Sequence, residues 1–201
     1  MGRSGASVVA RGLGVRARRG WVFRDVDVDA APGELIAVTG PSASGRTSLL
    51  LALAGHFRTT HGTVTVDGPT ALGYVPRVHE PEAGLTVLEH VTERLLLLGR
   101  APWGRGRRAE TARRAIDGYP LDSGTLGRDL DAYGSHLLCL ALAQLRQPGL
   151  IVVDDADVAL SAAEHTALWK RLRAAGATVV VACREVDPGL PDRIVALPAR
   201  P

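Results

Sequence analysis

The sequence predicts an α/β fold in which a mainly parallel sheet is covered by helices on both faces. Three observations support this. Short apolar runs of strand character alternate along the chain with longer segments of helical character. Several of these runs are uninterrupted, as in "LIAVTG" and "ATVVVAC", which is typical of strands buried on both faces. The chain has 201 residues, 46% of them hydrophobic, which suits one domain with a substantial core.

Each expected element has a local signal. Most of the expected strands end at or beside a glycine, a proline or an acidic residue. They are residues 21–28, 35–40, 61–68 (a strand or a hairpin), 71–77, 150–155, 177–183 and 193–198. The expected helices are residues 46–56, 85–99, 108–116, 138–147 and 161–176, with 101–108 as a loop. Thr86 is the expected N-cap of the second helix, because Glu89 follows three residues later.

The charge is mildly basic, with a net charge of +3 and a pI of about 9.3. Such a balance fits an anionic ligand, a membrane surface or nucleic acid, and equally well arginine-rich helices that are simply solvated. Lys170 is the only lysine among the 24 basic residues, which indicates a preference for arginine along the whole chain.

Cys139 and Cys183 lie far apart without metal-ligand spacing, so we expect two reduced, buried thiols. The apolar runs are too short for a membrane span, and the first residues lack a long apolar leader segment. We therefore expect a soluble protein that would need a partner for any role at a membrane.

The stretch "TGPSASGRTSLL" at residues 39–50 has the spacing of a phosphate-binding loop, G-x-x-x-x-G-K-[ST]. It stands between an expected strand and an expected helix, where backbone N–H groups and a helix N-terminus can hold phosphate. Arg46 occupies the lysine position, and its planar guanidinium could pair with phosphate as a fork. The alternative is a Gly/Ser-rich turn. The candidate phosphate-binding residues are Gly40, Pro41, Ser42, Ala43, Ser44, Gly45, Arg46, Thr47 and Ser48.

Residues 150–155, "LIVVDD", predict a buried strand that ends in two carboxylates. Thr47 and Asp154 are the candidate Mg²⁺ ligands, because hydroxyl and carboxylate oxygens suit this cation. Asp155 stands where a carboxylate could accept a proton from an attacking water. Read alone, the pair could be two acids at a strand end. Together with the loop at 40–48 it predicts ATP and Mg²⁺ as ligands.

In order and spacing, the chain resembles the ATP-binding cassette (ABC) family, the nucleotide-binding subunits of ABC transporters, from about residue 20 to residue 187. The resemblance rests on "PGELIAVTGPSASGRTSLLLALAG", "GTVTVDG", "LGYVPR", "LTVLEHV", "LDAYGSHLLCLALAQLRQPGLIVVDDAD" and "GATVVVACREVD". It implies a P-loop NTPase fold of ABC type, with an antiparallel β portion near the N-terminus and a helical insert. It places a RecA-like core at about 1–77 and 148–201 and a helical subdomain at about 78–147.

The chain departs from the family at most positions that handle the γ-phosphate. The substituted positions are Ala43 (a loop glycine), Arg46 (the loop lysine), Arg77 (the Q-loop glutamine), Asp155 (the catalytic glutamate), Ser161 (the D-loop aspartate) and Arg184 (the switch histidine). The signature LSGGQ corresponds to Leu130, Asp131, Ala132, Tyr133 and Gly134. There an acid replaces the serine that bonds the partner's γ-phosphate, and a tyrosine replaces a glycine. Ala17 takes the place of the aromatic residue that stacks on adenine, and Trp21 is a candidate substitute or a core residue of its strand.

The resemblance therefore implies an ATP-binding subunit with weak or lost hydrolysis, in which Asp155 is the candidate base. We expect Arg46, Arg77 and Arg184 to converge on the phosphates. The implied partners are a membrane permease subunit and a second cassette, in a homodimer or a heterodimer, at the inner, cytoplasmic face of the cell membrane. One alternative is a catalytically dead cassette with a regulatory or scaffolding role. Another is a nucleic-acid-binding protein that uses the arginines of 100–114, but the chain shows no recognised module for this, so nucleic acid is not expected.

Overall fold

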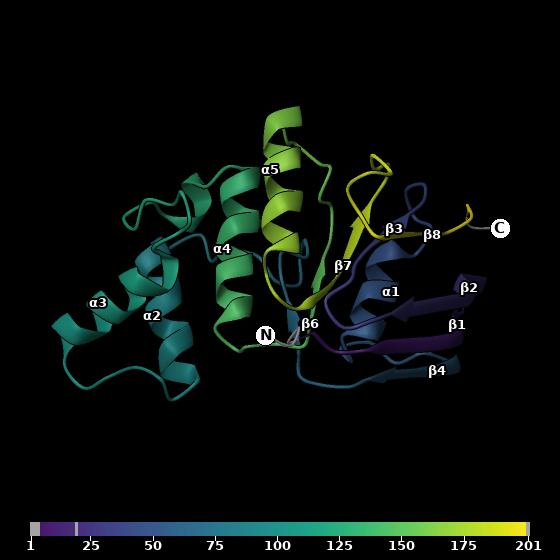
Figure 1. Ribbon diagram of the computed structural model, residues 1–201, viewed down its shortest axis with the longest axis horizontal. Helices are drawn as coiled ribbons and strands as arrows, with labels where there is room; N and C mark the ends of the chain where they lie inside the picture. The colour runs from purple at the N-terminus through teal and green to yellow at the C-terminus, as the bar shows by residue number, and fades with distance from the viewer. Residues whose placement is uncertain (1–4, 19, 200–201) are drawn as a thin grey trace.

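A five-stranded parallel sheet forms the centre of the computed structural model, which describes residues 5–18 and 20–199 (Figure 1). The strand order is β5-β6-β7-β3-β8, and every neighbouring pair is parallel. The strands are β3 (Leu35–Thr39), β5 (Thr70–Leu72), β6 (Leu150–Val153), β7 (Thr178–Cys183) and β8 (Arg193–Ala196). The three inner strands, β6, β7 and β3, are almost wholly buried, as expected for a sheet covered on both faces.

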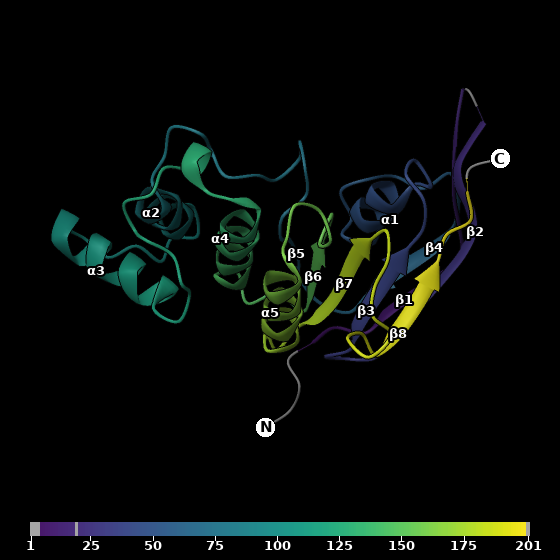
Figure 2. The ribbon, with the colours of Figure 1, turned by 90° about the horizontal axis from the view of Figure 1, so that it is seen from above.

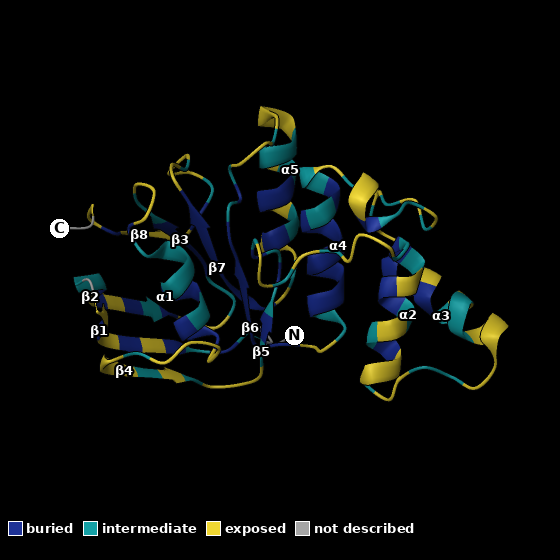
Figure 3. Cartoon of the chain, turned by 180° about the vertical axis from the view of Figure 1, so that it is seen from behind, coloured by how far each residue is buried: buried dark blue, intermediate teal, exposed yellow. Residues whose placement is uncertain are grey.

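A smaller antiparallel sheet packs beside the parallel one. It has the order β2-β1-β4 and consists of β1 (Val8–Ala17), β2 (Gly20–Ala30) and β4 (His61–Val66). Buried and exposed residues alternate along much of these strands (Figure 3), because one face meets the core while the other meets solvent.

Helices cover both faces of the parallel sheet, with α1 on one side and α4 and α5 on the other (Figure 2). The remaining helices, α2 and α3, lie beyond α4 at the end of the molecule away from the antiparallel sheet. The helices are α1 (Arg46–Leu53), α2 (Val87–Leu97), α3 (Arg105–Ile116), α4 (Ala132–Gln144) and α5 (Ala162–Arg173), with a short 3-10 turn at Gly127–Asp129. Within the part of the chain that the structure describes, no helix combines the length and hydropathy needed to cross a membrane.

Three hydrophobic cores follow from this layering. Along β3, Ile36 and Val38 face the core shared with α1 and the antiparallel sheet, whereas Leu35 and Ala37 face α4 and α5. The third core joins α2 and α3 to α4. Helix α4 contributes Leu140 to the second core and Leu138, Ala141 and Leu142 to the third, so it is the structural link between the sheet and the outer helices.

The predicted α/β class with its parallel sheet, antiparallel portion and helices on both faces is confirmed. The expected cap at Thr86 is also present, because Thr86 forms a capping box with Glu89, and Ser161 forms a second one with Glu164 at the start of α5. Several element bounds were wrong. No strand was expected at 8–17, since the glycines and arginines of β1 break its pattern, and its pairing with β2 is irregular at three places.

Three further bounds differ for local reasons. Helix α4 begins at Ala132 and not at 138, because Asp131 caps it. Helix α3 begins at Arg105, within the segment that was expected to be a loop. The strand expected over 71–77 ends at Leu72, and the next residue, Gly73, donates its backbone N–H to Val152. The proposed boundary between core and helical subdomain stays a prediction.

The cap of α5 gives a direct test of how Ser161 is used. The Ser161 hydroxyl accepts from the Glu164 N–H at 3.3 Å, and the Ser161 N–H donates to the Glu164 carboxylate at 2.8 Å. We expect Ser161→Ala to lower the free energy of unfolding by about 1 kcal/mol, measured by urea denaturation, whereas Ser161→Asp should keep it because aspartate caps equally well. If both variants lose the same stability, the cap is not the reason.

Candidate functional site

The loop at 40–45 joins the end of β3 to the start of α1 and surrounds a cavity of about 270 Å³. Gly45 is the N-cap of α1 with φ +92°, and a Cβ there would lie 2.7 Å from the Val22 carbonyl oxygen. Glycine is therefore required at this position. The first turn of α1 has backbone N–H groups without intrahelical acceptors, which makes the loop a site for an anion. The cavity is lined by Val22, Pro41, Ala43, Ser44, Gly45, Arg46, Thr47 and Ser48.

Two polar groups in this loop are buried without a partner, the Ser44 hydroxyl and the Arg46 Nε. The Nη1 atom of Arg46 donates to the Gly40 carbonyl and, at 3.3 Å, to the Pro41 carbonyl. The arginine that replaces the motif's lysine is thus anchored on the loop backbone. Buried donors are nearly always satisfied in folded proteins, so the remaining ones indicate an absent acceptor.

Asp154 follows β6 and reaches the start of α1. Its carboxylate is buried, with 2% of the residue exposed, and accepts from the Thr47 hydroxyl at 2.5 Å and from the Asp155 N–H at 2.9 Å. Burial raises the pKa of this carboxyl, while the hydrogen bonds from Thr47 and Asp155 oppose the rise. The two candidate Mg²⁺ ligands are therefore in contact. A hydroxyl and a buried carboxylate are hard oxygen donors, and they fit the cation.

Several site positions have a left-handed backbone. Ala43, Arg77 and Asp155 have φ of +65°, +62° and +49°, and they are three of the six non-glycine residues with positive φ in the described part of the chain. Such conformations are strained for residues with a Cβ and concentrate at functional sites. Their coincidence with the predicted site positions supports a binding role for this region.

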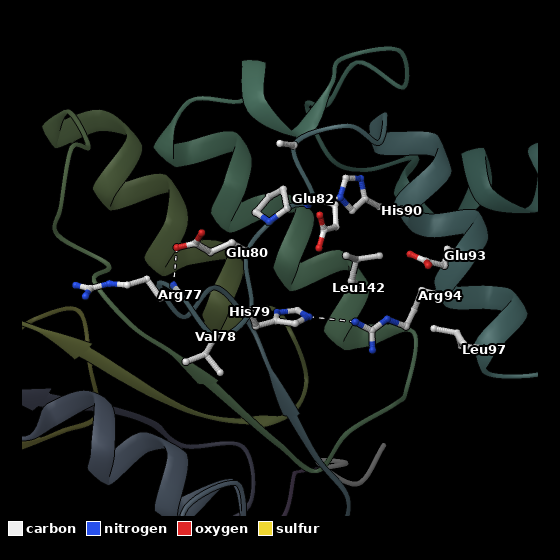
Figure 4. Close-up of a pocket in the computed structure, with 12 residues that line it drawn as sticks. Arg77, Val78, His79, Glu80, Glu82, His90, Glu93, Arg94, Leu97 and Leu142 are labelled. Carbon is white, nitrogen blue, oxygen red and sulfur yellow. Dashed lines mark hydrogen bonds between the residues drawn. The ribbon is translucent and has the colours of Figure 1, made fainter.

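The expected convergence of three arginines on the phosphates stays a prediction, and the contacts of Arg77 and Arg184 in this structure do not support it. Only Arg46 lines the loop cavity. Arg77 is exposed and lines a separate cavity toward α2, where its N–H donates to Glu80 at 2.6 Å (Figure 4). Arg184 is held by Asp157, whose Oδ2 accepts from both the backbone N–H and the Nε of Arg184 at 3.1 Å. These arginines were grouped on sequence grounds, but Arg46 begins α1, Arg77 lies in the loop after β5 and Arg184 follows β7, and each has different partners.

The signature segment is used for folding in this structure. The Asp131 carboxylate accepts from the Gly134 N–H at 2.6 Å and so caps α4, beginning a helix that also contains Ala132. Tyr133 packs against the second core, and Leu130 packs against the third. The acid at the family's serine position therefore has a structural role that the sequence alone did not indicate.

At the end of β1, Ala17 is exposed and pairs with Gly20 across the turn. The Trp21 ring lies 4.7 Å from the ring of His61 on β4, with the Arg16 guanidinium 5.9 Å from its centroid. A Cβ on Gly14 would lie 2.9 Å from the same ring. Trp21 thus packs over the antiparallel sheet, and it does not line the loop cavity.

Sequence reasoning missed one histidine beside the candidate base. His136 on α4 is buried, its ring lies 4.5 Å from that of Tyr74, and it lies close to the Asp155 backbone. Its Nδ1 atom is buried without a partner. Nothing in the sequence marked this residue, because a histidine within an apolar helix has no spacing signal. Asp157, the partner of Arg184, was missed for a similar reason.

The fold and the contact between Thr47 and Asp154 define a P-loop nucleotide-binding protein. A sequence model described as ABC transporter matches residues 23–158. The chain belongs to the ABC transporter family, and it corresponds to the ATP-binding subunit within it.

Named relatives agree with this assignment. The aliphatic sulfonates import ATP-binding protein SsuB 1 of Rhodococcus jostii is 30% identical over 92% of this chain and 77% of its own length. The hemin import ATP-binding protein HmuV of Gloeobacter violaceus is 32% identical, over 52% of this chain and only 40% of its own length. A solved dimer of the ATP-binding cassette MJ0796 bound to ADP and Pi has a TM-score of 0.78 at 21% identity, with 94% of each chain covered. This structural likeness supports the fold.

His136 gives the site a test through pH. Burial lowers the pKa of its imidazole from 6.5 to about 4. Between pH 6.5 and about pH 4, the unfolded chain therefore binds a proton on this side chain, whereas the folded chain does not. Stability should therefore fall as the pH falls through this window, by about 2 kcal/mol between pH 7 and pH 5. Urea denaturation of the wild type and of His136→Gln measures this, and the variant should lack that part of the slope. Equal slopes would contradict a buried neutral imidazole.

Proposed function

We propose that this chain binds ATP at the loop 40–48 as the ATP-binding subunit of an ABC transporter and hydrolyses it weakly or not at all. The observation that carries the binding proposal is the pair of buried, unpartnered groups, the Ser44 hydroxyl and the Arg46 Nε, beside the loop cavity. Phosphate oxygens are acceptors that would satisfy both donors. The N-terminus of α1 adds a favourable field for the negative charge.

Thr47 and Asp154 would hold Mg²⁺ in this proposal, because they are hard oxygen donors in contact with each other at the start of α1. When bound, the cation supplies neutralisation of phosphate charge. The burial of Asp154 favours this role, since a buried carboxylate is costly unless it is paired.

Weak or lost hydrolysis is supported by where the chemistry-bearing side chains are engaged. Asp155 is the candidate base, and its carboxylate is one methylene shorter than that of glutamate. The switch-position residue Arg184 is bonded to Asp157, and Asp131 caps α4. Arg184 and Asp131 could reach a γ-phosphate only after losing these hydrogen bonds. The same observation favours the second candidate, a dead cassette that regulates or supports an active partner.

A membrane permease is the proposed partner at the outer helical region, in the segment proposed as the helical subdomain. A cavity of about 550 Å³ lies between the segment after β5 and α2 (Figure 4). Val78 and Leu97 at this cavity are 52% and 76% exposed, which suits contact with another protein. This subunit would then work at the inner face of the membrane, paired with a second cassette as a homodimer or a heterodimer.

The nucleic-acid alternative has less support. Three of the arginines in the 100–114 segment already have partners. Arg114 pairs with Glu110 at 2.9 Å, Arg108 donates to the Pro102 carbonyl, and Arg100 donates to the Leu145 carbonyl.

Ser44→Ala separates ligand binding from folding. Removing a buried hydroxyl that has no partner should raise the free energy of unfolding of the ligand-free protein by about 1 kcal/mol. The same change should weaken ATP binding by about tenfold, because a phosphate contact is lost. Thermal unfolding with and without millimolar ATP and Mg²⁺ measures both effects, and Ser123→Ala outside the loop is the control. Absence of any ATP-dependent shift in the wild type would refute the binding proposal.

The rate of ATP hydrolysis tests the proposal that several substitutions together, and not Arg46 alone, weaken the reaction. We expect Arg46→Lys alone to leave ATP hydrolysis within a few-fold of the wild-type rate, because Arg77, Asp131 and Arg184 are unchanged. Phosphate release by the purified variant measures this. A rise of several hundredfold from this single change would show that Arg46 alone limits the reaction.

A further inference from the structure

A third, smaller cavity of about 100 Å³ lies at the end of α1 opposite to the loop, and it shares His79 and Arg94 with the cavity beside α2. Side chains from the ends of α1 and α4, from β5 and from α2 enclose it. Every ionisable residue that lines it is basic, and none is a carboxylate. Its lining residues are His56, Ala71, Leu72, His79, Arg94, Ala143 and Arg146.

The hydrogen bonds inside this cavity leave donors available. The Nδ1 atom of His79 lies 2.8 Å from the Gly73 carbonyl, and its Nε2 lies 3.1 Å from the Arg94 Nη2 (Figure 4). Nδ1 must therefore be the donor and Nε2 the acceptor, so the imidazole is neutral. One N–H of Arg94 is used in this way. In the described chain, neither Arg94 nor Arg146 is within ion-pair distance of a carboxylate.

The local charge is positive after the helix ends are included. The C-termini of α1 and α4 each contribute about −0.5 of a charge, so together they offset about one of the two arginines. Burial lowers the pKa of His79, and the nearby Arg94, His56 and His90 lower it further. Glu80, Glu82 and Glu93 line the adjoining larger cavity, which shares His79 and Arg94 with this one, but none of these carboxylates lines the smaller cavity or pairs with Arg94 or Arg146 within 4.0 Å in the described chain.

The size of the cavity limits what the balancing anion can be. The volume of about 100 Å³ exceeds the roughly 30 Å³ share of one water molecule and is well below the 300–1,000 Å³ of sites for drug-sized ligands. The guanidinium groups of arginine have several N–H donors in a plane, which suits the oxygens of phosphate and related anions.

We propose that Arg94, Arg146 and His56 form a binding site for a small tetrahedral oxyanion, phosphate or sulfate, distinct from the nucleotide loop. The site joins α2, α4 and the end of α1, so an anion there would tie the outer helices to the sheet. Helix α1 has eight residues and is therefore about 12 Å long, and it separates this site from the nucleotide loop by more than the Debye length of about 8 Å at physiological salt, so direct electrostatic coupling between the two is weak.

The six histidines provide a readout that distinguishes this site from the loop. The ring signals can be followed by NMR while phosphate replaces chloride at constant ionic strength, and sulfate and glycerol phosphate are tested in the same way. We expect the His56 signals to move and the pKa of His79 to rise by about one unit, because an anion at Arg94 favours the imidazolium. His165, which accepts from Trp169, should not respond. If none of the anions changes His56 or His79, the proposal is wrong. Response to glycerol phosphate alone would also overturn it, since free phosphate would then not be a ligand.

A charge-removing variant assigns the response to these arginines. The pair Arg94→Gln and Arg146→Gln should abolish the response of His56 and should reduce stabilisation by phosphate in thermal unfolding at least fivefold. The matched control is Arg107→Gln with Arg113→Gln on α3, which removes the same charge from an exposed or partly exposed helix and should leave the response intact. An unchanged His56 response in the first pair would place the anion elsewhere and overturn the proposal.

Discussion

The hydrogen bond between Thr47 and Asp154 is the contact on which the rest of the site depends. It joins the start of α1 to the end of β6 although the residues lie 107 positions apart in sequence. A carboxylate buried to this degree is unfavourable without partners, and Thr47 and the Asp155 backbone supply them. The contact forms because β3 and β6 both flank β7 in the parallel sheet, so that their carboxyl ends meet at the same edge.

Around this contact, side chains at several altered positions form hydrogen bonds within the chain. Asp131 bonds the first turn of α4, Arg184 bonds Asp157, and Arg46 bonds the carbonyls of its own loop. A hydrogen bond that involves a charged group contributes about 1.5–3 kcal/mol. Any ligand that recruits one of these side chains must first compensate for the bond it breaks. The residue type at a family position is therefore an incomplete guide to its role.

The strands and helices with strong local signals could be predicted from the sequence. The buried apolar runs at 35–40 and 177–183 and the capping residues Thr86 and Ser161 depend on local chemistry, and the structure contains them. Strand β1 could not be predicted, because its stability comes from pairing with β2 and β4 across the antiparallel sheet.

The same distinction applies to the site. The proximity of Thr47 and Asp154 followed from two motifs that the sequence displays. The partners of Arg184 and of Asp155 did not, because Asp157 and His136 approach them only through the packing of β7 and α4. Pairings of this kind are set by tertiary geometry, and no spacing in the sequence encodes them.

The position of α4 between two cores has a mechanical consequence. Its side chains interlock with the sheet on one side and with α2 and α3 on the other, and packed interiors transmit displacement because they contain little free volume. A force applied to the outer helices is therefore carried through α4 to His136 and the Asp155 backbone. The backbone of Asp155 is left-handed, with φ +49°, and such a conformation is strained for a residue with a Cβ. Strain imposed on the outer helices would thus reach Asp155, the candidate base.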